Sequence, residues 1–293
     1  MINQALLSDT EIRRLINQGR QLPLASHSAD NTQTGEQSTE GLGHGMDFAD
    51  MRPYQPGDNP RRIDWRASAR RQQTLIRLYH ADTSTPCCIL VDRQASMRFG
   101  SRVRSKSAQA ARIAIILASA NMQGGNPLSA LILGKKTHWI KPSSEKNVFQ
   151  RLTQAISKAS PPLDEIDENN IDWQTVSSQI LHRLSTNSSL YIISDFLSLD
   201  PGCTRSLQQL GKYYRCHALQ IIDPVESTLT QRAGLQLCWG DKQLDLDNGS
   251  QQIMQQQVWQ QQLESLFQGS GITHQTISSD LEELTPHLQV RPR

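Results

Sequence analysis

The chain has 293 residues, of which 37% are hydrophobic and 20% charged, so it can form one large domain or two modest ones with a buried core. Its 30 lysines and arginines against 28 aspartates and glutamates leave a net charge of +2, which argues against capture of nucleic acid or anionic membrane by overall charge. The most apolar run, IAIILASA, is far shorter than the roughly 20 residues that span a bilayer, so we expect no transmembrane segment.

The first 45 residues predict a helix followed by a polar loop. Apolar side chains recur at helical spacing over 5–19, whereas 25–45 is rich in Ser, Thr and Gly and too hydrophilic to bury. The N-terminus lacks an apolar run of signal-peptide length. The five cysteines, an odd number without metal-clip spacing, indicate reduced thiols. We therefore expect residues 1–45 to be an N-terminal helix with a flexible loop, in a cytoplasmic protein.

The next segment, which contains PYQPGDNPRRIDWRASAR, combines a turn, a tryptophan and several arginines. Gly57 follows a proline and predicts a tight turn, and Trp65 is expected to be an anchor that buries a large apolar area. Asp58 and Asp64 lie near the arginines and predict charge-assisted pairs. We expect residues 46–85 to pack on the core as an ordered brace. A partner-binding surface and phosphate contact are the alternatives.

From Cys87 onward, short apolar runs alternate with helical patterns. The apolar runs, typical of buried strands, lie at 87–92, 128–134, 190–195, 216–222 and 272–277. The sequence THWI predicts an additional hairpin strand. Strands that alternate with helices imply parallel crossovers, so we predict that residues 86–293 form an α/β domain, an open, mainly parallel sheet with helices on both faces. Ligands bind such sheets beyond the carboxyl ends of the strands.

Oxygen-bearing side chains follow two of the predicted strands. Asp92, Gln94 and Ser96 come after the first, and Asp195 ends a later one. Because the carboxyl ends of parallel strands meet at one edge of a sheet, these side chains should lie close together. Hard cations such as Mg²⁺ or Mn²⁺ prefer oxygen ligands of this kind. The alternative is that both aspartates cap loops and helix N-termini.

This arrangement resembles the metal-ion-dependent adhesion site of von Willebrand factor A-type domains. That site uses an Asp-x-Ser-x-Ser loop, a Thr from a second loop and an Asp from a third. Asp92, Ser96 and Asp195 match three of these positions. Gln94 stands where the first Ser belongs, and the stretch DENNID has no Thr for the second loop. The resemblance implies a degenerate site, which either still binds a metal or has lost the ability to bind one.

The stretch DFADMRPYQPGDNPRRIDWRASARRQQTLIR resembles the signature of the family called domain of unknown function 58. Members carry R-x-Y-x-x-G-D-x-x-R-x-I-D-W-x-x-S-A-R just before a von Willebrand factor A-like domain. Family members are often encoded beside a MoxR-type AAA+ ATPase, so the resemblance implies such an ATPase as partner. The matching residues are Arg52, Tyr54, Gly57, Asp58, Arg61 or Arg62, Ile63, Asp64, Trp65, Ser68, Ala69 and Arg70.

The hypothesis that follows is a non-enzymatic adaptor that acts with the ATPase on a client protein in a chaperone-like way. Arg93 and Arg98, beside the predicted metal site, are expected to receive a carboxylate of the partner. Arginines of the signature segment provide a second partner-binding surface, made of Arg61, Arg62 and Arg66.

Two other functions stay open as alternatives. One is an Mg²⁺-dependent hydrolase that uses Asp92 and Asp195, although the sequence has no G-x-S-x-G, phosphate loop or G-x-G-x-x-G after a strand. The other is a nucleic-acid binder that uses the arginine-rich segment. It is disfavoured because the net charge is small and aromatic stacking residues are not interleaved with the arginines.

Overall fold

The computed structural model describes residues 6–22, 48–55, 60, 63–79, 85–134, 137–158, 172–199, 201–228, 236–239, 242–245 and 249–288. The chain divides into two compact units, and each is described by itself. We call Met1–Leu24 together with Thr85–Arg293 the sheet unit, and Ala25–Ser84 the signature unit.

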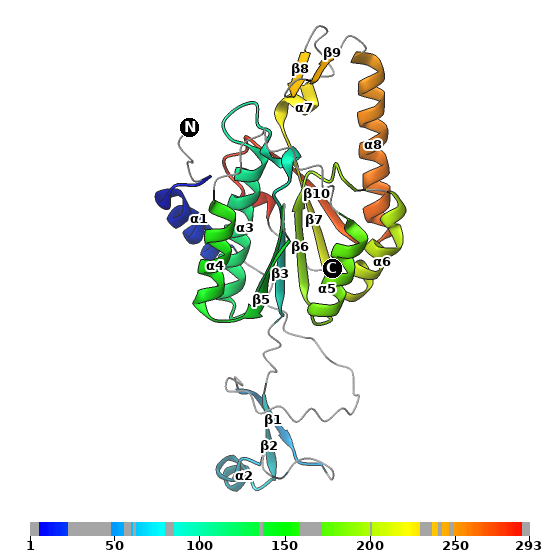
Figure 1. Ribbon diagram of the computed structural model, residues 1–293. Helices are drawn as coiled ribbons and strands as arrows, with labels where there is room; N and C mark the ends of the chain where they lie inside the picture. The colour runs from blue at the N-terminus through cyan, green and yellow to red at the C-terminus, as the bar shows by residue number, and fades with distance from the viewer. Residues whose placement is uncertain are drawn as a thin grey trace. The chain divides into compact units, whose positions relative to one another are not determined.

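The sheet unit is built on six strands. They are β3 (Cys87–Asp92), β4 (Leu128–Leu133), β5 (His138–Ser143), β6 (Ser189–Ser194), β7 (Arg215–Ile222) and β10 (Thr273–Ser278). Their order in the sheet is β10-β7-β6-β3-β4-β5, and each neighbouring pair is parallel except β4 with β5 (Figure 1). This topology confirms the predicted open, mainly parallel α/β sheet and the hairpin strand at its edge.

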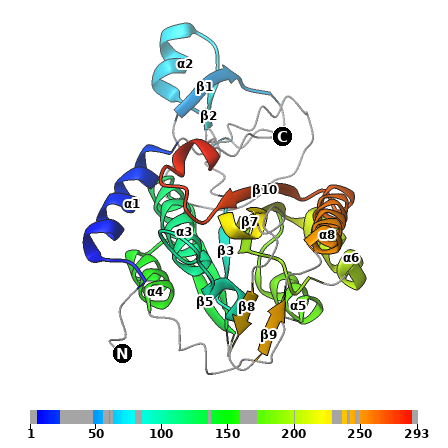
Figure 2. The same cartoon turned by 90° about the horizontal axis from the view of Figure 1, so that it is seen from above.

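Helices cover both faces of this sheet, as predicted. They are α1 (Asp9–Gln21), α3 (Lys106–Gln123), α4 (Lys146–Ser157), α5 (Trp173–Arg183), α6 (Thr204–Tyr213) and α8 (Gly249–Gly269). Figure 2 shows α1, α3 and α4 on one side of the sheet and α5, α6 and α8 on the other. Alternate side chains of β3 enter the two cores, with Ile89 and Val91 on the first side and Cys88 and Leu90 on the second.

The sheet unit also contains the shorter elements α7 (Pro224–Thr228), β8 (Gln236–Trp239) and β9 (Lys242–Asp245), of which β8 and β9 pair antiparallel. Among the described residues, every helix is too short or too polar to cross a lipid bilayer.

Helix α1 belongs to the sheet unit. Ser8 caps its start by accepting a hydrogen bond from the Glu11 amide at 3.2 Å. At its other end, a Cβ on Gly19 would lie 2.4 Å from the carbonyl oxygen of Ile116, so only glycine allows this close approach of α1 to α3. The Ser119 hydroxyl of α3 also donates to the Ile16 carbonyl at 2.9 Å.

The signature unit contains an antiparallel pair, β1 (Phe48–Pro53) with β2 (Leu75–Tyr79), and the short helix α2 (Trp65–Arg71). Asp64 caps α2 by accepting from the Ala67 amide at 3.0 Å, and Ser68 accepts from the Leu75 amide at 2.8 Å, which ties the helix to β2. The Tyr54 amide donates to the Thr74 carbonyl at 2.8 Å. These signature residues therefore organise the unit locally.

Other signature residues give a different outcome. Trp65 was expected to be a buried anchor, but within the signature unit, where it is the first residue of α2, 70% of its surface is exposed, so its own unit does not bury it. Arg66 and Arg70 are also exposed on α2. The predictions for Gly57, Asp58, Arg61 and Arg62 lie outside the described residues. That the segment packs on the core of the sheet unit stays a prediction.

Candidate functional site

The carboxyl ends of β3 and β6, adjacent strands in the sheet, bring Asp92 and Asp195 together. Asp92 is the last residue of β3, and Asp195 directly follows β6. Their exposed fractions are only 1% and 3%. The sequence therefore predicted the position of both carboxylates correctly, and the open question is what neutralises them.

Asp92 is enclosed by donors from its own loop and from β6. One carboxylate oxygen accepts from the Gln94 amide at 2.9 Å, and the other accepts from the Ser194 hydroxyl at 2.6 Å. Burial raises the pKa of Asp92 to about 7, and the nearby charge of Asp195 adds to this rise. Asp92 therefore titrates near neutral pH, and its hydrogen bonds hold together the loops that follow β3 and β6.

Asp195 is neutralised by an ammonium group that the sequence prediction missed. Lys106, the first residue of α3, is 1% exposed, and its Nζ donates to Asp195 Oδ2 at 2.9 Å and to Glu226 Oε1 at 2.6 Å. Burial by itself would lower the pKa of Lys106, but the two carboxylates raise it above the ordinary value. Lys106 is therefore a charged, buried cation between one carboxylate directly after β6 and another on α7.

This cation bears on the predicted metal site of Asp92, Gln94, Ser96 and Asp195. A divalent ion bound to Asp195 would lie close to the Lys106 ammonium, and at about 4 Å the repulsion would be roughly 8 kcal/mol at an effective dielectric constant of 20. The backbone amide of Gln94 donates a hydrogen bond to Asp92, and Ser96 lies in the short 3₁₀ helix η2 (Ala95–Arg98). In the described part of the chain, groups of three or more His, Cys, Asp or Glu side chains suited to a metal are absent. The charges of this cluster therefore favour an ammonium over a divalent metal beside Asp195.

A third buried carboxylate, Asp223 directly after β7, fixes the loop that leads from β3 to α3. It accepts from the Ser101 amide and the Ser279 hydroxyl, both at 2.9 Å, and also binds the Ser101 hydroxyl. Burial would raise the pKa of Asp223, but these hydrogen bonds and one from the Val225 amide lower it below the ordinary value. Asp223 thus stays charged and holds the loop in one conformation.

Exposed apolar side chains occur in the loops that follow β3 and β6. Phe99 and Val103, in the loop between β3 and α3, are 37% and 71% exposed, and Leu197, after β6, is 58% exposed. Their loops are tied to the charged cluster, because the Lys106 amide donates to the Phe99 carbonyl at 2.8 Å and the Leu197 amide to Asp195 Oδ1 at 3.2 Å. We call Phe99, Val103 and Leu197 the apolar rim.

Arg93 and Arg98, the two arginines predicted to receive a partner carboxylate, lie in the segment that follows β3 and have different environments. The guanidinium of Arg93 donates to the carbonyls of Ala155 and Lys158, both at 2.6 Å, so it holds the C-terminal end of α4. This contact gives Arg93 a helix-capping role that the sequence did not reveal. Arg98 ends η2 and is half-buried.

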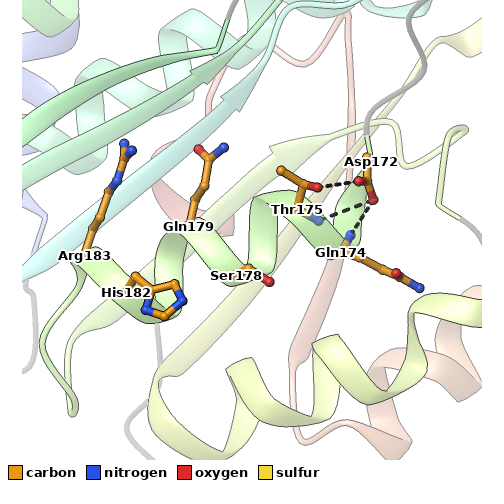
Figure 3. Close-up of a pocket in the computed structure, with 7 residues that line it drawn as sticks. All are labelled: Asp172, Gln174, Thr175, Ser178, Gln179, His182 and Arg183. Atoms are coloured by element: carbon orange, nitrogen blue, oxygen red, sulfur yellow. Dashed lines mark hydrogen bonds between the residues drawn. The ribbon is translucent and has the colours of Figure 1, made fainter.

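A hollow on the outer face of α5 is a different kind of surface. Figure 3 shows its lining side chains following one another along the helix, without converging on one point. Asp172 caps α5 by accepting from the amides of Gln174 and Thr175 at 3.0 and 3.3 Å. This hollow is best explained as a solvated helix face. Its lining residues are Asp172, Gln174, Thr175, Ser178, Gln179, His182 and Arg183.

The fold and the site define an α/β protein with a buried ammonium–carboxylate cluster at the carboxyl edge of its parallel strands. Residues 50–260 match a protein family, and the chain belongs to it: DUF58, described as protein of unknown function.

Curated relatives of the chain include Uncharacterized protein Mb1516 of Mycobacterium bovis and Uncharacterized protein Rv1480 of Mycobacterium tuberculosis. Each is 28% identical over 183 residues, which cover 62% of this chain and 56% of the relative. The chain therefore matches little more than half the length of these relatives.

Similar solved structures include the conserved hypothetical protein BatB from Bacteroides thetaiotaomicron, with a TM-score of 0.45 and 9% identity over 66% of this chain and 90% of that one. An aerotolerance-related membrane protein from Bacteroides fragilis has a TM-score of 0.44 and 9% identity over 67% and 92%.

Proposed function

We propose that this protein is a non-enzymatic adaptor that binds a partner protein through the loops that follow β3 and β6. The observation that carries the proposal is the apolar rim, because large apolar side chains exposed next to fixed charges are typical of protein-binding surfaces. The hydrogen bonds of Asp92, Lys106 and Asp223 hold these loops in place, so the surface is organised before a partner binds.

The partner that the family resemblance suggests is a MoxR-type AAA+ ATPase. In this proposal the ATPase supplies the work of ATP hydrolysis, and the adaptor, with a von Willebrand factor A-like sheet unit, directs it to a client protein in a chaperone-like reaction. The position of the rim at the carboxyl ends of parallel strands supports the proposal, because that edge is where open α/β sheets bind their ligands.

The geometry favours this function over the hydrolase alternative. Both oxygens of Asp92 accept hydrogen bonds from the protein, and Asp195 is 3% exposed and bound to Lys106. A catalytic carboxylate must reach its substrate, and these two carboxylates are enclosed. Among the described residues, the nucleic-acid alternative is supported by exposed arginines of α2, such as Arg66.

The test is to measure binding of a MoxR-type ATPase from the same organism to purified wild-type protein and to variants of the rim. Leu197→Asp and Val103→Asp should each weaken binding tenfold or more, since charge in the middle of an apolar contact is costly. Val258→Asp is the matched control, because Val258 is an exposed valine (44%) on α8 of the same unit. Equal binding by all three variants would refute the proposed surface.

A further inference from the structure

The two carboxylates that bind the Lys106 ammonium differ in their access to solvent. Side-chain exposure is 1% for Lys106, 4% for Asp195 and 26% for Glu226. Asp195 is also held by the Leu197 amide, so it is a fixed part of the sheet edge. Glu226 lies on α7, a helix of only five residues. Of the two carboxylates, Glu226 is therefore the one that another molecule can reach and replace.

Two of the groups that hold Glu226 are donors suited to a carboxylate. One oxygen accepts from Lys106 Nζ at 2.6 Å, and the other accepts from the Asp223 amide at 2.9 Å. An ammonium and an N–H that bind the two oxygens of one carboxylate give strong, charge-assisted hydrogen bonds with defined geometry. The Lys106 charge is buried and already neutralised on one side by Asp195, so its other side needs a second acceptor.

We propose that Lys106 and the Asp223 amide form a carboxylate-binding site that recognises an acidic side chain of a partner protein, which replaces Glu226. Lys106 is the built-in cation of this site and does the work that a divalent metal would do at an adhesion site. That the ligand is a protein side chain rests on the proposed function. Two residues of the apolar rim are tied to this site by backbone hydrogen bonds, Phe99 to the Lys106 amide and Leu197 to Asp195. The partner therefore carries an aspartate or glutamate beside apolar residues.

The first test uses acetate as the probe. Glu226→Ala removes the internal carboxylate and leaves its two donors in place, so sodium acetate at pH 7 should raise the thermal midpoint of this variant by about 2–4 °C at several times the dissociation constant. Sodium chloride at equal ionic strength and neutral acetamide should have no such effect, and neither should acetate on the wild type. An equal response of variant and wild type, or none in the variant, would overturn the inference.

A second test does not depend on the Glu226 variant. Calorimetric titration of chelator-treated protein with Mg²⁺ and with Mn²⁺ should show no saturable binding, because the ammonium already neutralises the site. Saturable binding that Asp195→Asn abolishes would overturn the role given to Lys106. This experiment gives an answer even if the Glu226 variant is poorly folded.

The partner experiment separates the inference from the proposed function. Glu226→Ala should bind the ATPase more tightly than wild type, since the internal competitor is gone, and added acetate should weaken that binding. If acetate raises the thermal midpoint of Glu226→Ala but the rim variants bind the ATPase normally, the proposed surface is refuted and the carboxylate receptor is retained. If acetate has no effect on Glu226→Ala but the rim variants lose binding, the carboxylate receptor is refuted and the proposed surface is retained.

Discussion

Replacing Lys106 by methionine tests how the charged cluster is held together. Methionine keeps an unbranched chain of similar length and removes the ammonium. Asp195, 3% exposed, would then be a buried carboxylate without its cation. Removal of one partner of a buried ion pair costs about 3–5 kcal/mol, because the remaining charge is left uncompensated. Glu226, 26% exposed, can turn to water and adds little to this cost.

The assay is urea unfolding at pH 7.5 followed by circular dichroism, with Lys146→Met as the matched control. Lys146 also stands at the first position of a helix, α4, but is exposed, so its replacement should change the free energy of unfolding by less than about 0.5 kcal/mol. In Lys106→Met, adding Asp195→Asn removes the uncompensated charge, and at least half of the lost stability should return.

The reasoning would be refuted by a Lys106→Met protein that loses less than about 1 kcal/mol relative to Lys146→Met. It would also fail if Asp195→Asn destabilised the double variant further. Either result would mean that burial of the Lys106–Asp195 pair does not decide the stability of the sheet edge.

Three further variants test other parts of the fold by the same unfolding assay. The pKa of Asp92 is about 7 in the folded protein, against a reference value of 3.8, so the folded state binds more protons than the unfolded state between these pH values. The free energy of unfolding should therefore fall by up to about 4 kcal/mol as the pH rises through this range. Asp92→Asn should remove this fall, and an unchanged pH profile in the variant would contradict the reasoning. Gly211→Ala should cost at least about 2 kcal/mol, because its Cβ would lie 1.9 Å from a backbone oxygen of Ser270, whereas Gly269→Ala, with open space around it, should not. Arg112→Met should cost about 3 kcal/mol, because the buried guanidinium binds the carbonyls that follow β10, and a loss under 1 kcal/mol would argue against that contact.

The order of strands and helices in the sheet unit was predictable because the signals are local. Runs such as CCILVD, bounded by polar residues, indicate buried strands, and helical spacing of apolar residues indicates the covering helices. The predicted ends of the strands agree with the observed ends within one or two residues in most cases. The topology rule for parallel strands then placed Asp92 and Asp195 at one edge, as the structure has them.

The roles of single charged residues were not predictable in the same way. Arg93 was expected to receive a partner carboxylate, which stays a prediction, and the sequence did not reveal that its guanidinium holds the end of α4, more than 60 positions along the chain. Trp65 was expected to be buried on account of its size, yet the packing of its own unit leaves it exposed. In both cases the side chain has several acceptable environments, and its own sequence neighbours do not select one.

The sequence by itself determined the fold class, which residues form each helix and strand of the sheet, and the position of the two carboxylates at the strand ends. Each of these depends on residues a few positions apart or on a general rule of sheet topology. The tertiary structure alone decided what neutralises those carboxylates. Lys106 lies 89 positions from Asp195 and 120 from Glu226. A buried charge must find its counter-charge wherever the fold brings one, and that choice depends on the packing of three distant segments.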